Sequence, residues 1–181
     1  MPNPLSVLLP LLAVFFAFAA LPAVAQEPPL PQRESPRPET TNGVPHVQLG
    51  VKADPELTDD LLRGVAGFPS VRLGPTRVSL PGAVGFQLDA DIALAQPNAI
   101  VGGREFAHVH PDGSLHASLD PNIARRAIAA GWATAHPWAN QRQGWEGFVM
   151  IYTPTTEEEL AVVIQLVQSS YTYITGQTLP K

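Results

Sequence analysis

Three of the five histidines in this chain lie in one short stretch, at His108, His110 and His116. Imidazole is the commonest side-chain ligand for transition metals, and it titrates near neutral pH. Two histidines at i and i+2 with a third close by suit Zn, Cu, Ni or non-haem Fe. The spacing therefore predicts a divalent transition-metal site on these three residues. The alternatives are acid–base or anion-binding groups, or polar side chains that face solvent.

A β-hairpin is predicted to position these histidines. Pro111-Asp112-Gly113 has turn chemistry, because Pro fixes φ and Gly supplies a positive φ. The flanking residues alternate in polarity, so His108 should pair with His116 and His110 with Ser114. Because alternate residues of a strand share a face, we expect Phe106 on the histidine face. The opposite face should carry Glu105 and the apolar residues Ala107, Val109, Leu115, Ala117 and Leu119.

A further histidine, His136, lies beside two tryptophans and precedes a proline, which favours an extended backbone there. Together with the hairpin, this segment gives the expected ligand-binding set: His108, His110, Ser114, His116, His136, Trp138 and Trp145. Such a set would bind a small polar molecule. A serine beside a histidine could also act as a nucleophile, although the chain has no Gly-x-Ser-x-Gly motif.

Composition narrows the possible classes of function. The 181 residues carry a formal net charge of −5 and no basic run, which disfavours nucleic acid as a partner. The absence of cysteine excludes disulfides and thiolate metal sites. No glycine-rich motif for a nucleotide or a flavin is visible.

The chain divides into three parts. Residues 1–25 read as a signal peptide, with an apolar run and an Ala-x-Ala cleavage site at Ala23-Val24-Ala25. They predict export to the periplasm or the extracellular space, or a membrane anchor if the leader stays uncleaved. Residues 26–45 form a Pro-rich linker, expected to be extended. Residues 46–177 form one domain, and His46 at its edge is assigned no role.

The domain is predicted to be α+β. Asp54-Pro55 and Asp120-Pro121 are helix starts with an N-cap acceptor and Pro at N1. Residues 76–80 and 84–88 read as strands, and an amphipathic helix ends at Gly176. We expect a mainly antiparallel sheet with helices packed on one face, a layout analogous to YjbR-type and frataxin-like domains.

Two segments resemble a known family. Phe106-Ala-His-Val-His-Pro-Asp-Gly-Ser-Leu-His116 and Gly131-Trp-Ala-Thr-Ala-His-Pro137 resemble the small uncharacterised "luciferase domain" family, with a match over roughly residues 70–176. Taken with the leader and the histidine spacing, the resemblance leads us to expect an exported luciferase-domain-like protein whose histidine-lined site binds a metal or a small polar ligand. The alternatives are a non-catalytic binding or structural module of the cell envelope, and a metal-dependent oxidoreductase or hydrolase.

Overall fold

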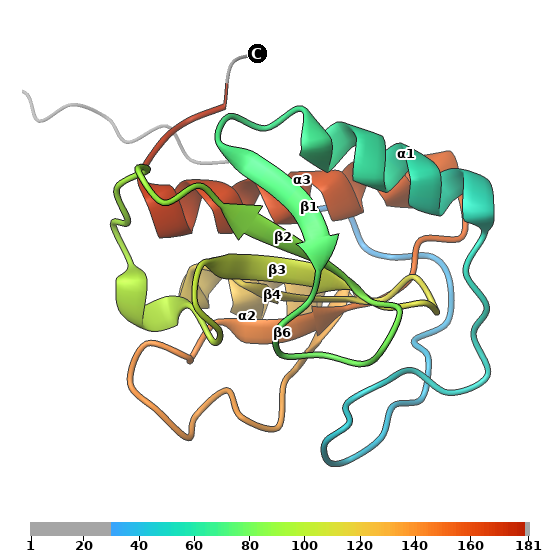
Figure 1. Ribbon diagram of the computed structural model, residues 1–181. Helices are drawn as coiled ribbons and strands as arrows, with labels where there is room; N and C mark the ends of the chain where they lie inside the picture. The colour runs from blue at the N-terminus through green and yellow to red at the C-terminus, as the bar shows by residue number, and fades with distance from the viewer. Residues whose placement is uncertain (1–29, 180–181) are drawn as a thin grey trace, which may run out of the picture.

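The computed structural model describes residues 30–179, so the predicted signal peptide lies outside the described residues. Within that range one antiparallel sheet has the strand order β1-β2-β3-β4-β6-β5 (Figure 1). The strands are β1 Val71–Pro75, β2 Val84–Leu88, β3 Glu105–Val109, β4 Leu115–Ser118, β5 Ala133–Ala135 and β6 Phe148–Ile151. The helices are α1 Pro55–Ala66, α2 Pro121–Ala129, α3 Glu157–Thr175 and the short 3₁₀ helix η1 Pro97–Ala99. The predicted α+β class is confirmed.

Local signals set the helix ends. Asp54 accepts a hydrogen bond from the N–H of Glu56 and begins α1, and Asp120 caps α2 through the N–H of Asn122. Gly176 ends α3 in the left-handed region, at φ 72°, where glycine avoids the Cβ penalty. Among the described residues, no helix has the length and apolar character needed to cross a bilayer.

The core lies between the sheet and the helices α1 and α3, which pack against each other (Figure 1). Helix α3 approaches the two central strands closely enough for Ser170 Oγ to donate to the carbonyl of Ser118 at 2.8 Å. Apolar residues of the hairpin, including Val109, Leu115 and Ala117, belong to this core. The histidines, which alternate with these residues, therefore point to the other side of the sheet, away from α1 and α3.

Residues 76–80, predicted as a strand, form a loop instead. The first strand lies earlier, at Val71–Pro75. Thr76 explains the change: its Oγ1 accepts a hydrogen bond from the N–H of Val78 at 3.2 Å and donates to Glu105 at 2.7 Å. These local bonds turn the chain out of the sheet. The loop that results lies on the histidine side.

A β-bulge corrects the predicted faces of two residues. Phe86 pairs with Ala107, but the next residue, Gln87, pairs with Glu105, so β3 carries one extra residue at Phe106. A bulge of this kind interrupts the alternation of side chains. Phe106 therefore packs against Phe86 and against Tyr171 of α3, and the carboxylate of Glu105 lies on the histidine side. Both residues were expected on the opposite faces, and that expectation was wrong.

Residues 30–50, which we call the strap, run along the outside of the domain (Figure 1). Most of this segment was expected to be a linker. Leu30 packs against the core, the Arg33 side chain is buried, and His46 and Gln48 are buried as well. The strap thus brings a distant part of the sequence to the histidine side of the sheet.

Candidate functional site

All five histidines of the chain meet in one cavity of about 330 Å³. Each of them is at most 5% exposed. The remaining wall is largely apolar, formed by Val44, Pro45, Val78, Ser79, Leu80, Val101, Trp138 and Phe148. The histidine face is thus concave and covered, a form typical of small-molecule sites.

The predicted hairpin is confirmed and explains how three of the rings converge. His108 pairs with His116, and the N–H of His110 donates to the carbonyl of Ser114 at 2.8 Å. In the turn, Asp112 Oδ1 accepts from the N–H of Ser114 at 2.9 Å, and Gly113 has φ 83°. A residue with a Cβ would be strained at that φ, so the turn chemistry fixes the register that places the imidazoles together.

A chain of hydrogen bonds joins a buried carboxylate to three imidazoles. Glu105 Oε1 lies 2.9 Å from His108 Nδ1, and His108 Nε2 lies 3.1 Å from His116 Nδ1. His116 Nε2 lies 3.3 Å from His46 Nδ1. An ionised carboxylate only accepts hydrogen bonds, so a neutral His108 donates to Glu105 from Nδ1. The next two rings must then donate in the same direction, and each of the three carries its proton on Nδ1. His46 Nε2 is then left with a free lone pair.

Glu105 is held firmly at the start of this chain. Its carboxylate also accepts from Thr76 Oγ1 at 2.7 Å and from the N–H of Arg77 at 2.9 Å. Burial by itself raises the pKa of Glu105, but the hydrogen bonds from His108, Thr76 and Arg77 bring the pKa below its usual value. Gly85 leaves room for the group, since a Cβ there would lie 2.6 Å from Glu105 Oε2.

His110 is oriented by Ser114, which is in turn held by Asp112. Its Nδ1 lies 3.0 Å from Ser114 Oγ, and that hydroxyl donates to Asp112 Oδ1 at 2.7 Å. Since the Ser114 proton is already used, His110 donates from Nδ1, and Nε2 keeps the lone pair. Ser114 therefore fixes the orientation of the His110 ring.

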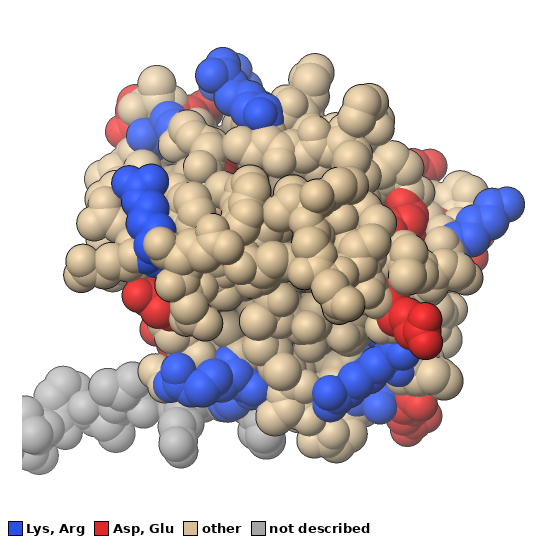
Figure 2. All heavy atoms as spheres, turned by 90° about the horizontal axis from the view of Figure 1, so that it is seen from below, with Lys and Arg blue, Asp and Glu red and all other residues tan. Residues whose placement is uncertain are grey.

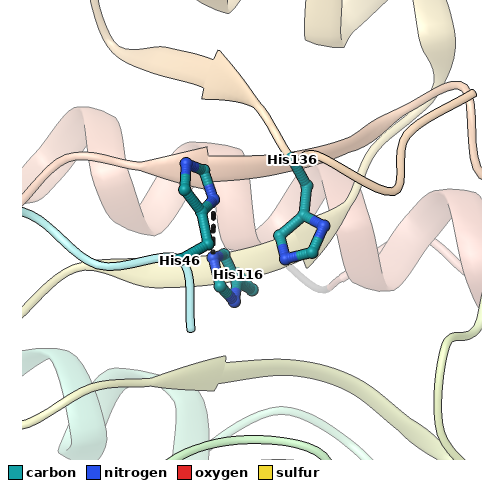
Figure 3. Close-up of side chains that lie close together, drawn as sticks. All are labelled: His46, His116 and His136. Carbon is teal, nitrogen blue, oxygen red and sulfur yellow. Dashed lines mark hydrogen bonds between the residues drawn. The ribbon is translucent and has the colours of Figure 1, made fainter. Parts of the chain in front are cut away.

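His136 has the opposite arrangement of its two ring nitrogens. The backbone N–H of Trp138 donates to His136 Nδ1 at 3.0 Å, so a neutral ring carries its proton on Nε2. Figure 3 shows His46, His116 and His136 close together, each carried by a different part of the chain. His136 can donate a hydrogen bond into the cavity.

Burial favours the neutral form of His46, His110, His116 and His136, and repulsion between neighbouring rings adds to it for the last three. Burial, with smaller contributions from nearby histidines, lowers the pKa of His110 to about 4 and that of His136 to about 3; Asp112 partly opposes the shift of His110. The pKa of His116 is lowered well below its ordinary value by the same causes, and burial lowers the pKa of His46. Neutral imidazole is the form that binds a metal.

Two predicted tryptophans lie at different depths. Trp138 lines the cavity and contacts the His136 ring edge to face, at 5.2 Å between centroids. Trp145 stacks on Trp138 at 6.2 Å, with the Arg142 guanidinium 5.4 Å from the Trp145 ring. Trp145 thus supports the wall formed by Trp138.

The mouth of the cavity is apolar. Val44 is 54% exposed and Val78 38% exposed, although both line the cavity. The cyan part of the strap, near residues 40–48, and residues 76–80 and 136–147 lie on the lower side of Figure 1. Figure 2 shows that face, with most charged side chains around its edge and few in its middle. The cavity therefore suits a molecule with substantial apolar surface and a polar group that reaches the imidazoles.

Two sets of three histidines have ligand nitrogens within 4.8 Å of one another: His108, His110 and His116, and His46, His116 and His136. The first set is the one predicted from the sequence. In the second set, His136 already uses Nδ1 to accept from Trp138, and its Nε2 carries the proton. The first set therefore fits a metal better.

His46 was missed by the sequence reasoning. It lies at the edge of a proline-rich segment, with no motif around it and far from the hairpin in the chain. The strap alone brings it to the cavity, and no local pattern in the sequence indicates that path.

Comparisons with known proteins agree with the resemblance noted in the sequence. Proteins named luciferase from Armillaria gallica, Armillaria mellea and Neonothopanus nambi are 29%, 28% and 27% identical to this chain over 169, 174 and 173 residues. The alignments cover 82%, 85% and 84% of this chain, and 62%, 64% and 63% of the relatives. The chain thus spans less than two thirds of their length. No solved structure matches it.

A family model described as "Luciferase domain" matches residues 103–170. The matched segment holds the hairpin with His108, His110 and His116, and also His136, whereas His46 lies outside it. The similarity of this chain to the luciferase domain family therefore covers residues 103–170 at the level of the family model.

Proposed function

We propose that His108, His110 and His116 bind a divalent transition metal at the wall of the cavity, where a small, largely apolar molecule with a polar group binds beside it. Zinc, copper, nickel and iron all accept imidazole ligands. Three protein ligands leave a coordination position for water or substrate, as in catalytic metal sites.

One observation carries this proposal: each proposed ligand has a hydrogen-bond partner at its other ring nitrogen. His108 has Glu105 at 2.9 Å, His110 has Ser114 at 3.0 Å, and His116 has His46 at 3.3 Å. Metal-binding histidines almost always have such partners, which fix the ring and its tautomer. The bonds leave Nε2 of His108, Nε2 of His110 and Nδ1 of His116 for the metal.

The separation of two of these nitrogens also fits. His108 Nε2 and His116 Nδ1 lie 3.1 Å apart. Zn–N bonds of about 2.0–2.1 Å in a tetrahedral site place neighbouring nitrogens about 3.3 Å apart. A metal ion between these rings would replace the hydrogen bond that joins them.

The relatives named luciferase favour an enzyme over a structural module. Metal-dependent oxidation is therefore the first reaction class to test, with metal-dependent hydrolysis as the alternative. We also propose that the protein is exported, on the basis of the apolar leader and the Ala-x-Ala site before Gln26.

Elemental analysis of the purified protein, prepared without a histidine tag, tests the metal site. We expect near-stoichiometric metal in the unsubstituted protein and in His136→Gln, and loss of metal in His110→Ala. His136 is the matched control, because it lines the same cavity but belongs only to the second set of histidines. Loss in His136→Gln with retention in His110→Ala would assign the metal to His46, His116 and His136. Folded protein that stays metal-free after reconstitution would refute the proposal.

A second candidate function rests on the hydrogen-bond chain from Glu105 to His46. Such a chain could act without a metal as a general base that takes a proton from the ligand. His46 Nε2, at its far end, would be the accepting atom. Metal-free protein that gains no metal on reconstitution would favour this function, and His46→Ala should then abolish activity.

A further inference from the structure

We infer that His46 is a positioning residue for the metal site, held there by the strap. This inference rests on the proposed metal binding by His108, His110 and His116. His46 would accept a hydrogen bond from Nε2 of His116 and so keep the other nitrogen of that ring, Nδ1, directed at the metal.

The strap is anchored firmly at one end by Arg33. The Arg33 side chain is 2% exposed and donates twice to the Glu159 carboxylate, at 3.1 Å each. It also donates to the carbonyl of Thr153 at 3.0 Å and lies near the rings of Trp132 and Tyr152, at 5.8 and 5.5 Å. A bidentate, buried guanidinium–carboxylate pair is geometrically specific, so this end of the strap has a fixed place.

The other end is fixed by Gln48, two residues beyond His46. Gln48 Nε2 donates to Thr153 Oγ1 at 2.7 Å, and its Oε1 accepts from the N–H of Thr153 at 3.1 Å. Within the strap, the N–H of Thr41 donates to the carbonyl of Val47 at 3.0 Å. The backbone around His46 is therefore held on both sides.

His46 meets its partner in a defined orientation. The His46 and His116 rings lie 5.4 Å apart between centroids, at an angle of 10°, and the His136 ring stands edge-on to His46 at 5.1 Å. His46 is 4% exposed. Water has little access to this ring. Within residues 30–179, His46 Nδ1 makes its hydrogen bond with Nε2 of His116.

Metal binding would reverse the direction of this bond. Without metal, Glu105 draws the ring protons toward itself, so His116 carries its proton on Nδ1. For Nδ1 to bind a metal, that proton must move to Nε2, 3.3 Å from His46 Nδ1. The His46 proton then moves to its own Nε2. Both rings stay neutral, so protons are neither gained nor lost in these two steps.

Zinc titration of purified His46 variants tests the inference. Removing a residue that hydrogen-bonds a ligand histidine typically weakens metal binding about 10–100-fold, and we expect that loss for His46→Ala. His46→Asn should recover much of the affinity, because its amide oxygen can accept from His116. Asn42→Ala, an exposed position on the same strap, should bind zinc as the unsubstituted protein does.

The ¹⁵N chemical shifts of the imidazole nitrogens show which nitrogen carries the proton. A loss of packing alone would not change that tautomer. We expect the proton of His116 on Nδ1 in metal-free protein and on Nε2 with zinc bound. Equal zinc affinity in His46→Ala, no recovery in His46→Asn, or an unchanged His116 tautomer would overturn the inference and leave the metal site standing. An unsubstituted protein that binds no zinc would overturn the proposed function and this inference together.

Discussion

Glu105 and His108 form a buried carboxylate–imidazole pair, with Oε1 and Nδ1 2.9 Å apart and both side chains at most 4% exposed. The pair exists because the bulge at Phe106 turns Glu105 toward the histidines. A carboxylate behind a ligand imidazole raises its basicity and fixes its tautomer. The proposed metal site would therefore depend on a residue that is not itself a ligand.

Glu105→Gln should weaken zinc binding about 10-fold or more, because the neutral amide is a poorer acceptor for His108. Isothermal titration calorimetry with zinc measures the change. Glu157→Gln, at an exposed position on α3, serves as the control for loss of one negative charge. Equal affinities in the two variants would show that Glu105 has no part in the site.

Gly85→Ala should destabilise the protein by about 1–3 kcal/mol, since an added methyl group overpacks a closed site. Its Cβ would lie 2.6 Å from Glu105 Oε2 and 3.2 Å from the Cα of Thr76. At Gly74, directly opposite in β1, an added Cβ would have nothing within 4 Å. Thermal unfolding of Gly85→Ala and Gly74→Ala compares the two positions. Similar midpoints would contradict the account of the space around Glu105.

Leu115→Ala should cost about 2–5 kcal/mol of unfolding free energy, the range for a leucine removed from a closed core. Leu115 is fully buried on the helix side of β4. Val78→Ala, at the exposed mouth of the cavity, should cost much less. Urea unfolding monitored by circular dichroism measures both. A larger loss for Val78→Ala would mean that the two faces of the sheet are assigned the wrong way round.

Stability should fall in acid because of Glu159. Burial raises its pKa, but hydrogen bonds from Arg33, Ser35 and Thr155 and the charge of Arg33 outweigh this and lower the pKa to about 2, from an ordinary value of 4.5. A carboxyl group with a lowered pKa in the folded state stabilises the protein above its unfolded pKa. That contribution is lost as the pH falls from about 4.5 toward 2.

Urea unfolding at a series of pH values between 5 and 2 measures this contribution. Glu159→Gln cannot ionise, so its unfolding free energy should depend less on pH over this range. If both proteins show the same slope, the Arg33–Glu159 pair does not account for the acid sensitivity.

The parts of the site that could be predicted are those set by neighbours in the chain. Pro111-Asp112-Gly113 fixed the register of His108 and His116, and Asp120-Pro121 predicted the start of α2. The bulge at Phe106 could not be predicted, because it depends on pairing with β2. The place of His46 could not be predicted either, because it follows from Arg33 and Gln48 binding residues more than 100 positions away in the chain.

The gathering of every imidazole into one cavity also leaves the outer surface of the protein without accessible histidine, and the chain has no cysteine. The folded, untagged protein should therefore pass through an immobilised-nickel column and react slowly with diethyl pyrocarbonate. Release of the strap would expose His46 and its neighbours to both. Retention on nickel and carbethoxylation then become direct assays of whether the cavity is open or closed.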